Sequence, residues 1–393
     1  MSGLGSATTT TNAAPAAGAR SRLPSLVGAP LSDQPRHFDY ADLTAFTTAV
    51  LQAVGCSATE ARRVAKCLVE ADARGLPSHG LLRLPLYVSS VEAGGIVPDA
   101  PMSWAHEYGA TATLDAGFGF GHTAIALAID KAGGLARTYG CAVVGVRRST
   151  HFGMAAPWVE RLAARGIVTF VLSNTGPSMA PFGSAEPLLG TNPISIGFPV
   201  DGRPPVVLDM ATSAGAFGRI VAAAKNGGEI PEGWALDAAG APTTDPEAAL
   251  KGVLLPFGEH KGSGLAIAIE LLAAALPGAL LSHQITDIWV DPGSRMGTGH
   301  LVIAIHPGSL TGTNTYTEQA TELVDRVSTS TLAAGHPAVR LPGDVERHQS
   351  DAAHEGGVAL AESTTADLDR LASRFSLTRI QPIDTTHRNE AKE

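Results

Sequence analysis

The sequence predicts an α+β fold, in which helices flank a mixed sheet. Helical patterns open the ordered part of the chain, and short β-branched runs crowd its middle third without alternating regularly with helices. No G-x-G-x-x-G segment follows a predicted strand, because GFGFGH at 117–122 has a histidine where the third glycine belongs. A doubly wound Rossmann domain is therefore not expected.

Helices are expected where apolar residues recur at helical spacing. The first starts near Asp39 and stops at Gly55, and the second opens with a capping box at 57–60 and ends near Gly75. Further helices are expected at 122–139, 154–165, 261–276, 316–332 and 365–375.

Strands are expected in the short runs of β-branched residues. These runs lie at 143–146, 166–173, 194–198, 206–208 and 301–305. Between the second and the third, NTGPSMAPFGSAEPLLGTNP at 174–193 has neither a helical nor a strand period. Loops of that length inside a domain are usually functional, so we expect this one to line a site.

The composition excludes several classes of protein. The net charge of −9, with no Lys/Arg run longer than a pair, predicts no binding to nucleic acid. Three scattered cysteines indicate neither a disulfide framework nor a thiolate metal site, and they favour a cytoplasmic protein. The apolar segment 265–281 is interrupted by Glu270 and Pro277, so it predicts a buried helix and no membrane span.

His79 and Arg83 stand four residues apart in SHGLLR. If a helix begins at Ser78, a good N-cap, the two side chains project from one face about 6 Å apart. Pro85 moves the expected start of the helix toward Leu82 and keeps the pairing approximate. A guanidinium fork matches a carboxylate, and a histidine exchanges protons near neutral pH, so the pair suits a 2-oxo or 2-hydroxy acid. The plainer alternative is a helix-capping histidine beside a surface ion pair.

Eight collinear motifs carry a resemblance to the malate/L-lactate dehydrogenase family, which is distinct from the Rossmann-type lactate and malate dehydrogenases. The motifs are ADARGLPSHGLLRLPLY at 71–87, GFGFGH at 117–122, STHFGMA at 149–155, SNTGPSMAPFGSAEPLLGTNPISIGFP at 173–199, VLDMATSAGAFGRI at 207–220, IPEGWALDAAGAPTTDP at 230–246, HKGSGLAIAIELL at 260–272 and RLPGD at 340–344.

The resemblance spans residues 37–377, between an expected disordered tail at 1–36 and a flexible tail at 378–393. It implies a non-Rossmann NAD(P)-binding fold with a largely antiparallel central sheet, a nucleotide-binding part at about 120–300, and C-terminal helices that return to a helical N-terminal part. It also implies NAD or NADP as cofactor, a small carboxylate as substrate, no metal, and a homodimer. The family's substrates include malate, lactate, sulfolactate, ureidoglycolate, diketogulonate and cyclic imino acids, and the resemblance does not choose among them.

The resemblance places Ser78, His79, Arg83 and His151 in the catalytic set. In some relatives the histidine matching His79 is assigned as the proton donor, and in the ureidoglycolate type it is the one matching His151. Both therefore remain candidates. His151 follows a predicted strand and precedes a helix, so we expect it at a helix N-terminus, which lowers a histidine pKa. His122 is expected to pack or to cap a helix.

Cofactor contacts are implied for a second set of residues. They are Thr175, Thr191, Asn192, Asp209, Met210, Ala211, Lys261, Gly262, Pro342 and Gly343. The Lys261 ammonium suits a pyrophosphate or ribose, and the Asn192 amide suits a nicotinamide carboxamide or substrate. Asp209 ends a predicted strand, where it faces a ligand or caps the next turn through Thr212.

Two alternative functions stay open, and a third is disfavoured. An imine reductase keeps the carboxylate anchor and protonates nitrogen, and a silent binding protein keeps the fold without activity. A hydrolase using Ser78 or Ser149 is disfavoured, because adjacent Ser78 and His79 point apart and no G-x-S-x-G elbow exists. Ser184, where relatives commonly have a second glycine, and Ser263, where they often have an aromatic residue, make substrate preference hard to carry over.

Overall fold

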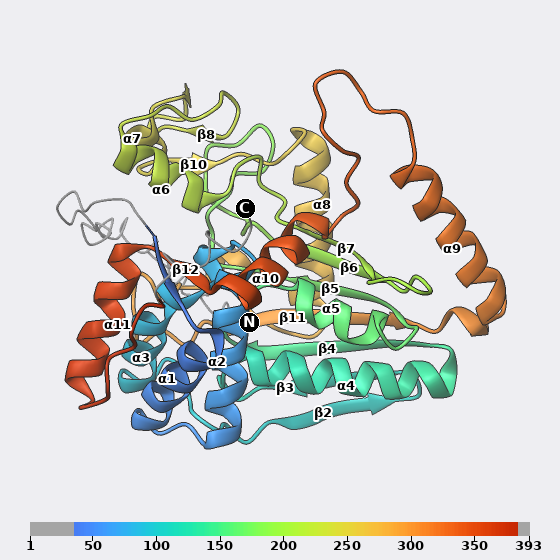
Figure 1. The fold of residues 1–393 in the computed structure, drawn as a ribbon, viewed down its shortest axis with the longest axis horizontal. Coiled ribbons are helices and arrows are strands. Elements are labelled where there is room, and N and C mark those ends of the chain that lie inside the picture. The colour runs from blue at the N-terminus through green and yellow to red at the C-terminus, as the bar shows by residue number, and fades with distance from the viewer. Residues whose placement is uncertain (1–34, 384–393) are drawn as a thin grey trace, which may run out of the picture.

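A seven-stranded mixed sheet runs through the centre of the protein (Figure 1). The computed structural model describes residues 35–383. Neighbouring strands pair antiparallel except β3 and β4, which pair in parallel, so the expected fold class is confirmed. In spatial order the strands are β2 (Ser103–Tyr108), β3 (Thr111–Asp115), β4 (Cys141–Ser149), β11 (Thr298–Ile305), β5 (Val168–Ser173), β6 (Ile194–Phe198) and β7 (Val206–Met210).

Helices cover both faces of this sheet. On one face α4 (Gly121–Tyr139) and α5 (Ala156–Ala163) bury a core of small and β-branched side chains against the strands. On the other face lie α8 (His260–Glu270) and a π-helical turn (Leu271–Ala275) that continues it. Both faces of the central strands are therefore buried, which explains why β4, β5 and β11 read as nearly continuous apolar runs.

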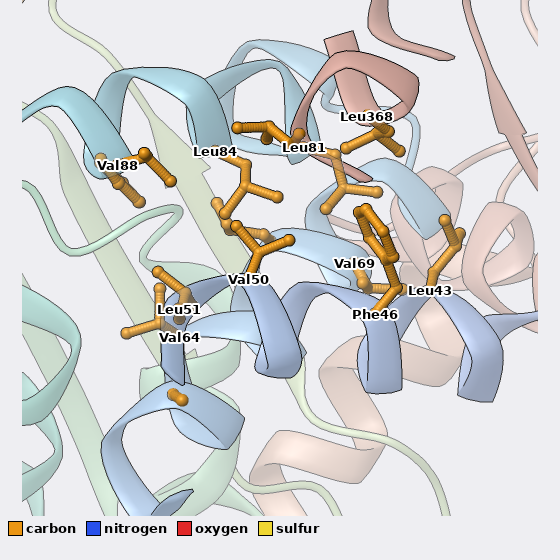
Figure 2. Packing of buried hydrophobic residues seen from close by; sticks show 14 of the residues in the cluster. Leu43, Phe46, Val50, Leu51, Val64, Val69, Leu81, Leu84, Val88 and Leu368 are labelled. Atoms are coloured by element: carbon orange, nitrogen blue, oxygen red, sulfur yellow. The ribbon is translucent and has the colours of Figure 1, made fainter. Parts of the chain in front are cut away.

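A second core lies in a helical layer beside the sheet. Figure 2 shows Leu43, Phe46 and Val50 of the first helix packed against side chains of α2 and α3, with Leu368 closing the cluster. A short antiparallel pair joins the two ends of the chain, matching Phe38 with Val358. The elements of this layer are β1 (Arg36–Phe38), α1 (Tyr40–Ala53), α2 (Ala58–Ala73), α3 (Leu84–Glu92), α10 (Asp344–Gly356), β12 (Val358–Leu360) and α11 (Glu362–Arg374).

Two further parts extend from the sheet (Figure 1). A small lobe contains a three-stranded antiparallel sheet and its own apolar cluster around Met179 and Ile220. The helix α9 (Thr313–Ser328) buries Val324 alone of its side chains. The lobe is made of α6 (Phe217–Asn226), β8 (Ala235–Leu236), β9 (Pro242–Thr243), α7 (Pro246–Ala249) and β10 (Val253–Leu254).

The observed elements differ from the expected ones where the local pattern is weak. The helix α10 was not expected, because DVERHQSDAAHEG has no apolar stripe and buries Ser350 alone. The helix expected to run to 276 becomes a π-helical turn after Glu270. The tails are shorter than expected, since Arg36 lies in β1 and the Ile383 amide donates to the His37 carbonyl (2.8 Å). The rest of both tails, 1–34 and 384–393, lies outside the described residues.

One largely buried ion pair ties the helical layer to the sheet. Arg74, at the end of α2, binds both carboxylate oxygens of Glu160 on α5 at 2.8 and 2.7 Å, and its Nε donates to Glu70 at 2.7 Å. We predict that Arg74→Met lowers the free energy of unfolding by about 3 kcal/mol, because two carboxylates lose their partner. Urea unfolding measures this change.

Arg326→Met is the matched control, because the pair of Arg326 with Glu322 is exposed at 78% and 63%. It should cost less than about 1 kcal/mol. Equal losses in the two variants would contradict a role for Arg74 in joining the layers.

Candidate active site

The segment that carries His79 and Arg83 is two successive 3-10 turns, Pro77–His79 and Leu81–Arg83, followed by α3 from Leu84. The expected α-helical start at Ser78 or Leu82 is therefore wrong. Pro85 falls in the first turn of α3, where no amide hydrogen is needed, so it starts this helix without a kink. His79 and Arg83 still lie on the same stretch, each at the last residue of its turn.

A buried carboxylate holds these turns in place. Asp72 of α2 accepts a hydrogen bond from the Leu81 amide (2.7 Å), and its carboxylate lies against Gly80. A Cβ on Gly80 would approach that carboxylate to 2.3 Å, so a glycine is required after His79. Burial raises the pKa of Asp72 to about 7.

Arg83 is fixed but has no anionic partner. Its Nε donates to the Ser78 carbonyl (2.7 Å), and its guanidinium lies over the Trp289 ring, 5.2 Å from the centroid. In the part of the chain that the structure describes, Arg83 makes no ion pair. The expected alternative of a surface ion pair is therefore absent, and the half-buried charge can take an anionic ligand.

The two candidate histidines lie together. The rings of His79 and His151 stack with centroids 5.6 Å apart. Ser78 Oγ lies 3.0 Å from His79 Nδ1, so the expectation that these adjacent side chains point apart is wrong. The Tyr87 hydroxyl lies 2.6 Å from His151 Nδ1. The Gly153 amide also donates to that nitrogen (3.2 Å), so Nδ1 accepts both bonds and the neutral ring carries its hydrogen on Nε2.

His151 does not lie at the N-terminus of α5, contrary to expectation. Four residues separate it from Ala156, where α5 begins, and the Ala156 amide is capped by Asp209 Oδ2 (2.7 Å). Asp209 therefore caps α5, and the expected capping of the next turn through Thr212 is wrong, since Thr212 bonds to the Thr191 carbonyl. The Asp209 oxygen Oδ2 is occupied by this bond.

The glycine-rich motif GFGFGH supports the backbone of the histidine segment. The Gly121 amide donates to Thr150 Oγ1 (3.0 Å), and Thr150 Oγ1 donates to the Gly119 carbonyl (3.0 Å). A Cβ on Gly121 would lie 2.2 Å from the Thr150 carbonyl and 2.7 Å from that of His151. This motif therefore lets the first turn of α4 approach the backbone that presents His151.

His79, His151 and the neighbouring His122 are neutral at physiological pH. Burial, and then the Arg83 charge, lower the pKa of His79 to about 3 and that of His151 well below its usual value. The same two causes act on His122, whose pKa is lowered to about 3. The pKa of His151 is therefore lowered by burial and by a cation, in place of the expected helix N-terminus.

Two more buried histidines, His122 and His300, lie close enough to His151 to affect its pKa. His122 is fully buried at the start of α4, with both ring nitrogens free of protein partners, and its ring packs against Tyr87 and His151. His300 of β11 lies between two serines, with Nε2 2.8 Å from Ser149 Oγ and Nδ1 2.8 Å from Ser173 Oγ. Ser149 is thus engaged inside the sheet.

The expected cofactor loops meet at a buried carboxylate. Asn192 Oδ1 accepts from the Thr175 amide (3.2 Å), and the Thr191 amide donates to Thr175 Oγ1 (3.1 Å). Asn192 Nδ2 donates to Glu270 Oε2 (2.7 Å), which also accepts from Ser282 Oγ (2.6 Å). The Asn192 amide is fully buried and used in these bonds, so it supports the loops and is not free to bind a carboxamide.

The remaining expected cofactor residues occupy two places. Lys261 is exposed in the first turn of α8 and, in the described residues, makes no ion pair; Gly262 is buried beside it, where a Cβ would meet the Phe257 carbonyl at 2.2 Å. On β7, the Val207 amide donates to the Pro342 carbonyl (3.1 Å), and Gly343 adopts a φ of +89° against Val207. The strand that carries Asp209 and Met210, with Ala211 directly after it, is therefore the neighbour of residues 342–343.

The exposed Lys261 ammonium, at a helix start beside a glycine backbone, fits an anionic dinucleotide. The buried Ser263 hydroxyl accepts from the Phe182 amide (3.0 Å), so it holds the loop that leads to Ser184.

Sequence reasoning missed four residues of the site. Tyr87, Asp287, Trp289 and Glu270 reach it from three separate segments. Tyr87 lies eight residues after His79, two α-helical turns on, and that spacing was the one available signal. Nothing local marks Asp287, Trp289 or Glu270, because their roles depend on long-range packing.

Comparison with known proteins decides the family. The family model described as malate/L-lactate dehydrogenase matches residues 38–369. The chain belongs to the malate/L-lactate dehydrogenase family. As a member of it, this chain is an oxidoreductase, and its mixed sheet is the fold shared by its structural neighbours.

Several relatives of this dehydrogenase family are similar along most of their length. The (2R)-3-sulfolactate dehydrogenase (NADP(+)) of Chromohalobacter salexigens is 39% identical over 300 residues, which cover 76% of this chain and 87% of that protein. A Delta(1)-pyrroline-2-carboxylate/Delta(1)-piperideine-2-carboxylate reductase of Pseudomonas putida is 37% identical over 334 residues, covering 84% and 96%. The structure of sulfolactate dehydrogenase from Methanocaldococcus jannaschii aligns with a TM-score of 0.82 at 34% identity, covering 87% of this chain and 98% of that one.

Two features are absent from the described residues of this dehydrogenase. Between residues 35 and 383, no three His, Cys, Asp or Glu side chains group as metal ligands. Within the same range no helix has the length and apolar character needed to cross a membrane.

The buried His122 makes stability depend on pH. The unfolded chain binds a proton at this residue below about pH 6.5, whereas the folded chain does so only below about pH 3. Its contribution to stability is therefore present above pH 6.5 and is lost as the pH falls toward 3. We predict that His122→Leu makes the fall in unfolding free energy between pH 6 and 4 shallower by about 1.4 kcal/mol per pH unit.

Urea unfolding across this pH range measures the slope. The exposed His336 supplies the control, since His336→Leu should keep the slope of the unchanged protein. Identical slopes in all three proteins would mean that His122 is protonated in the folded state.

Proposed function

We propose that the chain transfers a hydride between NAD or NADP and a small 2-hydroxy or 2-oxo carboxylic acid, as a malate- or lactate-like dehydrogenase. The observation that carries the proposal is the unpaired, half-buried Arg83 guanidinium beside the neutral His79 and the His151–Tyr87 pair. A cation without a counter-ion calls for a carboxylate, and neutral imidazoles beside it supply a proton acceptor for an adjacent hydroxyl.

Each side chain has a distinct role in this proposal. Arg83 binds the substrate carboxylate through its Nη groups, since Nε is bonded to the Ser78 carbonyl. His151 carries its hydrogen on Nε2, so it donates a hydrogen bond to the 2-oxygen while Tyr87 fixes the ring. His79, oriented by Ser78, accepts the hydroxyl proton in oxidation and returns it in reduction.

The charge of Arg83 links binding to proton transfer. Burial and the Arg83 charge keep the pKa of His79 low, so the imidazole is neutral and has a lone pair with which to accept the proton of a hydroxy acid. When a carboxylate binds, the two charges cancel and the histidine pKa rises. A 2-oxo acid therefore makes protonation of His79 easier as it binds, which prepares the acid that reduction needs.

The cofactor would lie against the segments that meet at Asn192, Gly262 and Gly343, with Lys261 facing its phosphates and Thr175, Thr191, Asp209, Met210 and Ala211 around it. When bound, the nicotinamide accepts or supplies the hydride at the substrate C2. Asn192 and Glu270 hold the two loops in register for it.

Two related reactions use the same anchor. Reduction of a cyclic imino acid keeps Arg83 on the carboxylate and places the proton on nitrogen, and oxidation of ureidoglycolate keeps it on the hydroxy acid. The names of the relatives include sulfolactate dehydrogenases and pyrroline- and piperideine-2-carboxylate reductases. A substrate panel should therefore contain both 2-hydroxy or 2-oxo acids and cyclic imino acids.

We propose a cytoplasmic homodimer. A stripe of apolar side chains on α8 and the π-helical turn supports the dimer, because Ile267, Leu271 and Leu276 are 43%, 58% and 64% exposed. The unpaired cysteines at 56, 67 and 141 support a reducing compartment.

The purified protein tests the proposal directly by oxidation of NADH and NADPH with a panel of 2-oxo and imino acids. Arg83→Lys should lower kcat/KM roughly 30- to 1000-fold, which corresponds to about 2–4 kcal/mol of lost transition-state stabilisation, because the charge stays while the two-pronged guanidinium contact is lost. Arg165→Lys, on an exposed residue outside the cluster and outside the eight motifs, is the control. Equal kcat/KM for Arg83→Lys and unchanged protein would remove Arg83 from the site.

The two histidines are separated by their pH profiles. His79→Ala should lower kcat by about 10²- to 10⁴-fold and flatten the pH-dependent limb of kcat/KM, because the proton carrier is gone. His151→Ala should lower kcat and keep that limb. The reverse pattern would assign proton transfer to His151.

A further inference from the structure

The segment 285–297, between the π-helical turn and β11, is fixed over the site. Ile285, Ile288 and Met296 are buried in the core of the helical layer. A Cβ on Gly95, at the end of α3, would lie 2.2 Å from the Pro292 carbonyl, so the backbones touch there. Segment 285–297 therefore presents the residues between these anchors in defined positions.

Trp289 covers one face of the Arg83 guanidinium, whose centre lies 5.2 Å from the indole centroid. The Nε of the same guanidinium is bonded to the Ser78 carbonyl. A carboxylate then has to approach in the guanidinium plane, through the Nη groups. Trp289 thus sets the direction from which a substrate enters the cluster, and its apolar ring lies beside that route.

Asp287 places a negative charge two residues before Trp289 in the same segment. Its Oδ1 accepts the Trp289 amide (3.0 Å), and its Cβ and Oδ2 lie 3.5 Å from where a Cβ on Gly176 would stand. Gly176 directly follows Thr175 of the cofactor loop. The carboxylate also acts on Tyr87: burial raises the pKa of that hydroxyl, the Arg83 charge opposes the rise, and the charge of Asp287 makes a smaller contribution to it.

We infer that Trp289 and Asp287 determine substrate specificity: they favour a carboxylic acid whose other end is uncharged or cationic, and they disfavour one with a second anionic group. The inference rests on the proposed function and names its substrate class. A second carboxylate or sulfonate would meet the like charge of Asp287 in a partly desolvated site, whereas an apolar or cationic group suits the indole face.

The full-length protein tests this with 2-oxobutyrate, piperideine-2-carboxylate, oxaloacetate and sulfopyruvate, each with NADH and NADPH. We expect kcat/KM for one of the first two to exceed that for both dianions by about ten-fold or more. Asp287→Asn should reduce this ratio about ten-fold by raising turnover of the dianions. Asp291→Asn is the control, because Asp291 lies in the same segment, is exposed, and caps Gly293.

The role of Trp289 is tested separately, through KM for carboxylates. Trp289→Leu should raise KM for every carboxylate by roughly three- to thirty-fold, and Trp289→Phe should restore most of the loss, because a ring again covers the guanidinium. Equal KM for Trp289→Leu and the unchanged protein would overturn its role.

Binding measured by calorimetry separates this inference from the proposed function. Without turnover, tighter binding of 2-hydroxybutyrate than of malate, lost in Asp287→Asn, would support charge selection while the proposed reaction fails. Turnover that favours oxaloacetate or sulfopyruvate, or an Asp287→Asn variant that behaves as Asp291→Asn does, would overturn charge selection while the proposed reaction stands.

Discussion

The arrangement of the site depends on one half-buried guanidinium that has no counter-ion. Arg83 is held by the Ser78 carbonyl and by the face of Trp289, so its position is fixed before any ligand arrives. Burial, and then the Arg83 charge, lower the pKa values of His79, His122 and His151, so these imidazoles are neutral. In the proposed reaction the charge, the proton carrier and the ligand are therefore coupled through this one side chain, and a bound carboxylate would change all of them at once.

Close backbone contacts make this arrangement possible. Gly80 lies against the buried Asp72 carboxylate, and Gly121 lies against the backbone of Thr150 and His151. Any side chain at either position would push apart the segments that carry the two histidines. The glycines of SHG and GFGFGH are thus required by packing between elements, and that packing sets the positions of His79 and His151.

On the side of the site proposed for the cofactor, a buried carboxylate holds the loops together. Asn174 and Asn192 donate to Glu270, which also accepts both the amide and the hydroxyl of Ser282. A buried carboxylate with this many donors joins two loops to the end of α8 without needing a regular element between them. These bonds fix the two ends of the long segment 174–193, which has no helical or strand period.

The sequence by itself determined the fold class, the main strands, and the presence of His79, Arg83 and His151 in one site, because these follow from local periodicity and from collinear motifs. It misplaced His151 at the start of α5 and assigned Asn192 to a ligand, since hydrogen bonds between distant segments decide both. The tertiary structure alone decided that Tyr87 binds His151, that Asp209 caps α5, that Trp289 covers Arg83, and that Asp287 accepts the Trp289 amide. The physical reason is that a side chain's partner, burial and pKa depend on residues far away in the sequence, which local patterns do not encode: Tyr87 and His151 are 64 positions apart, and Ala156 and Asp209 are 53 apart.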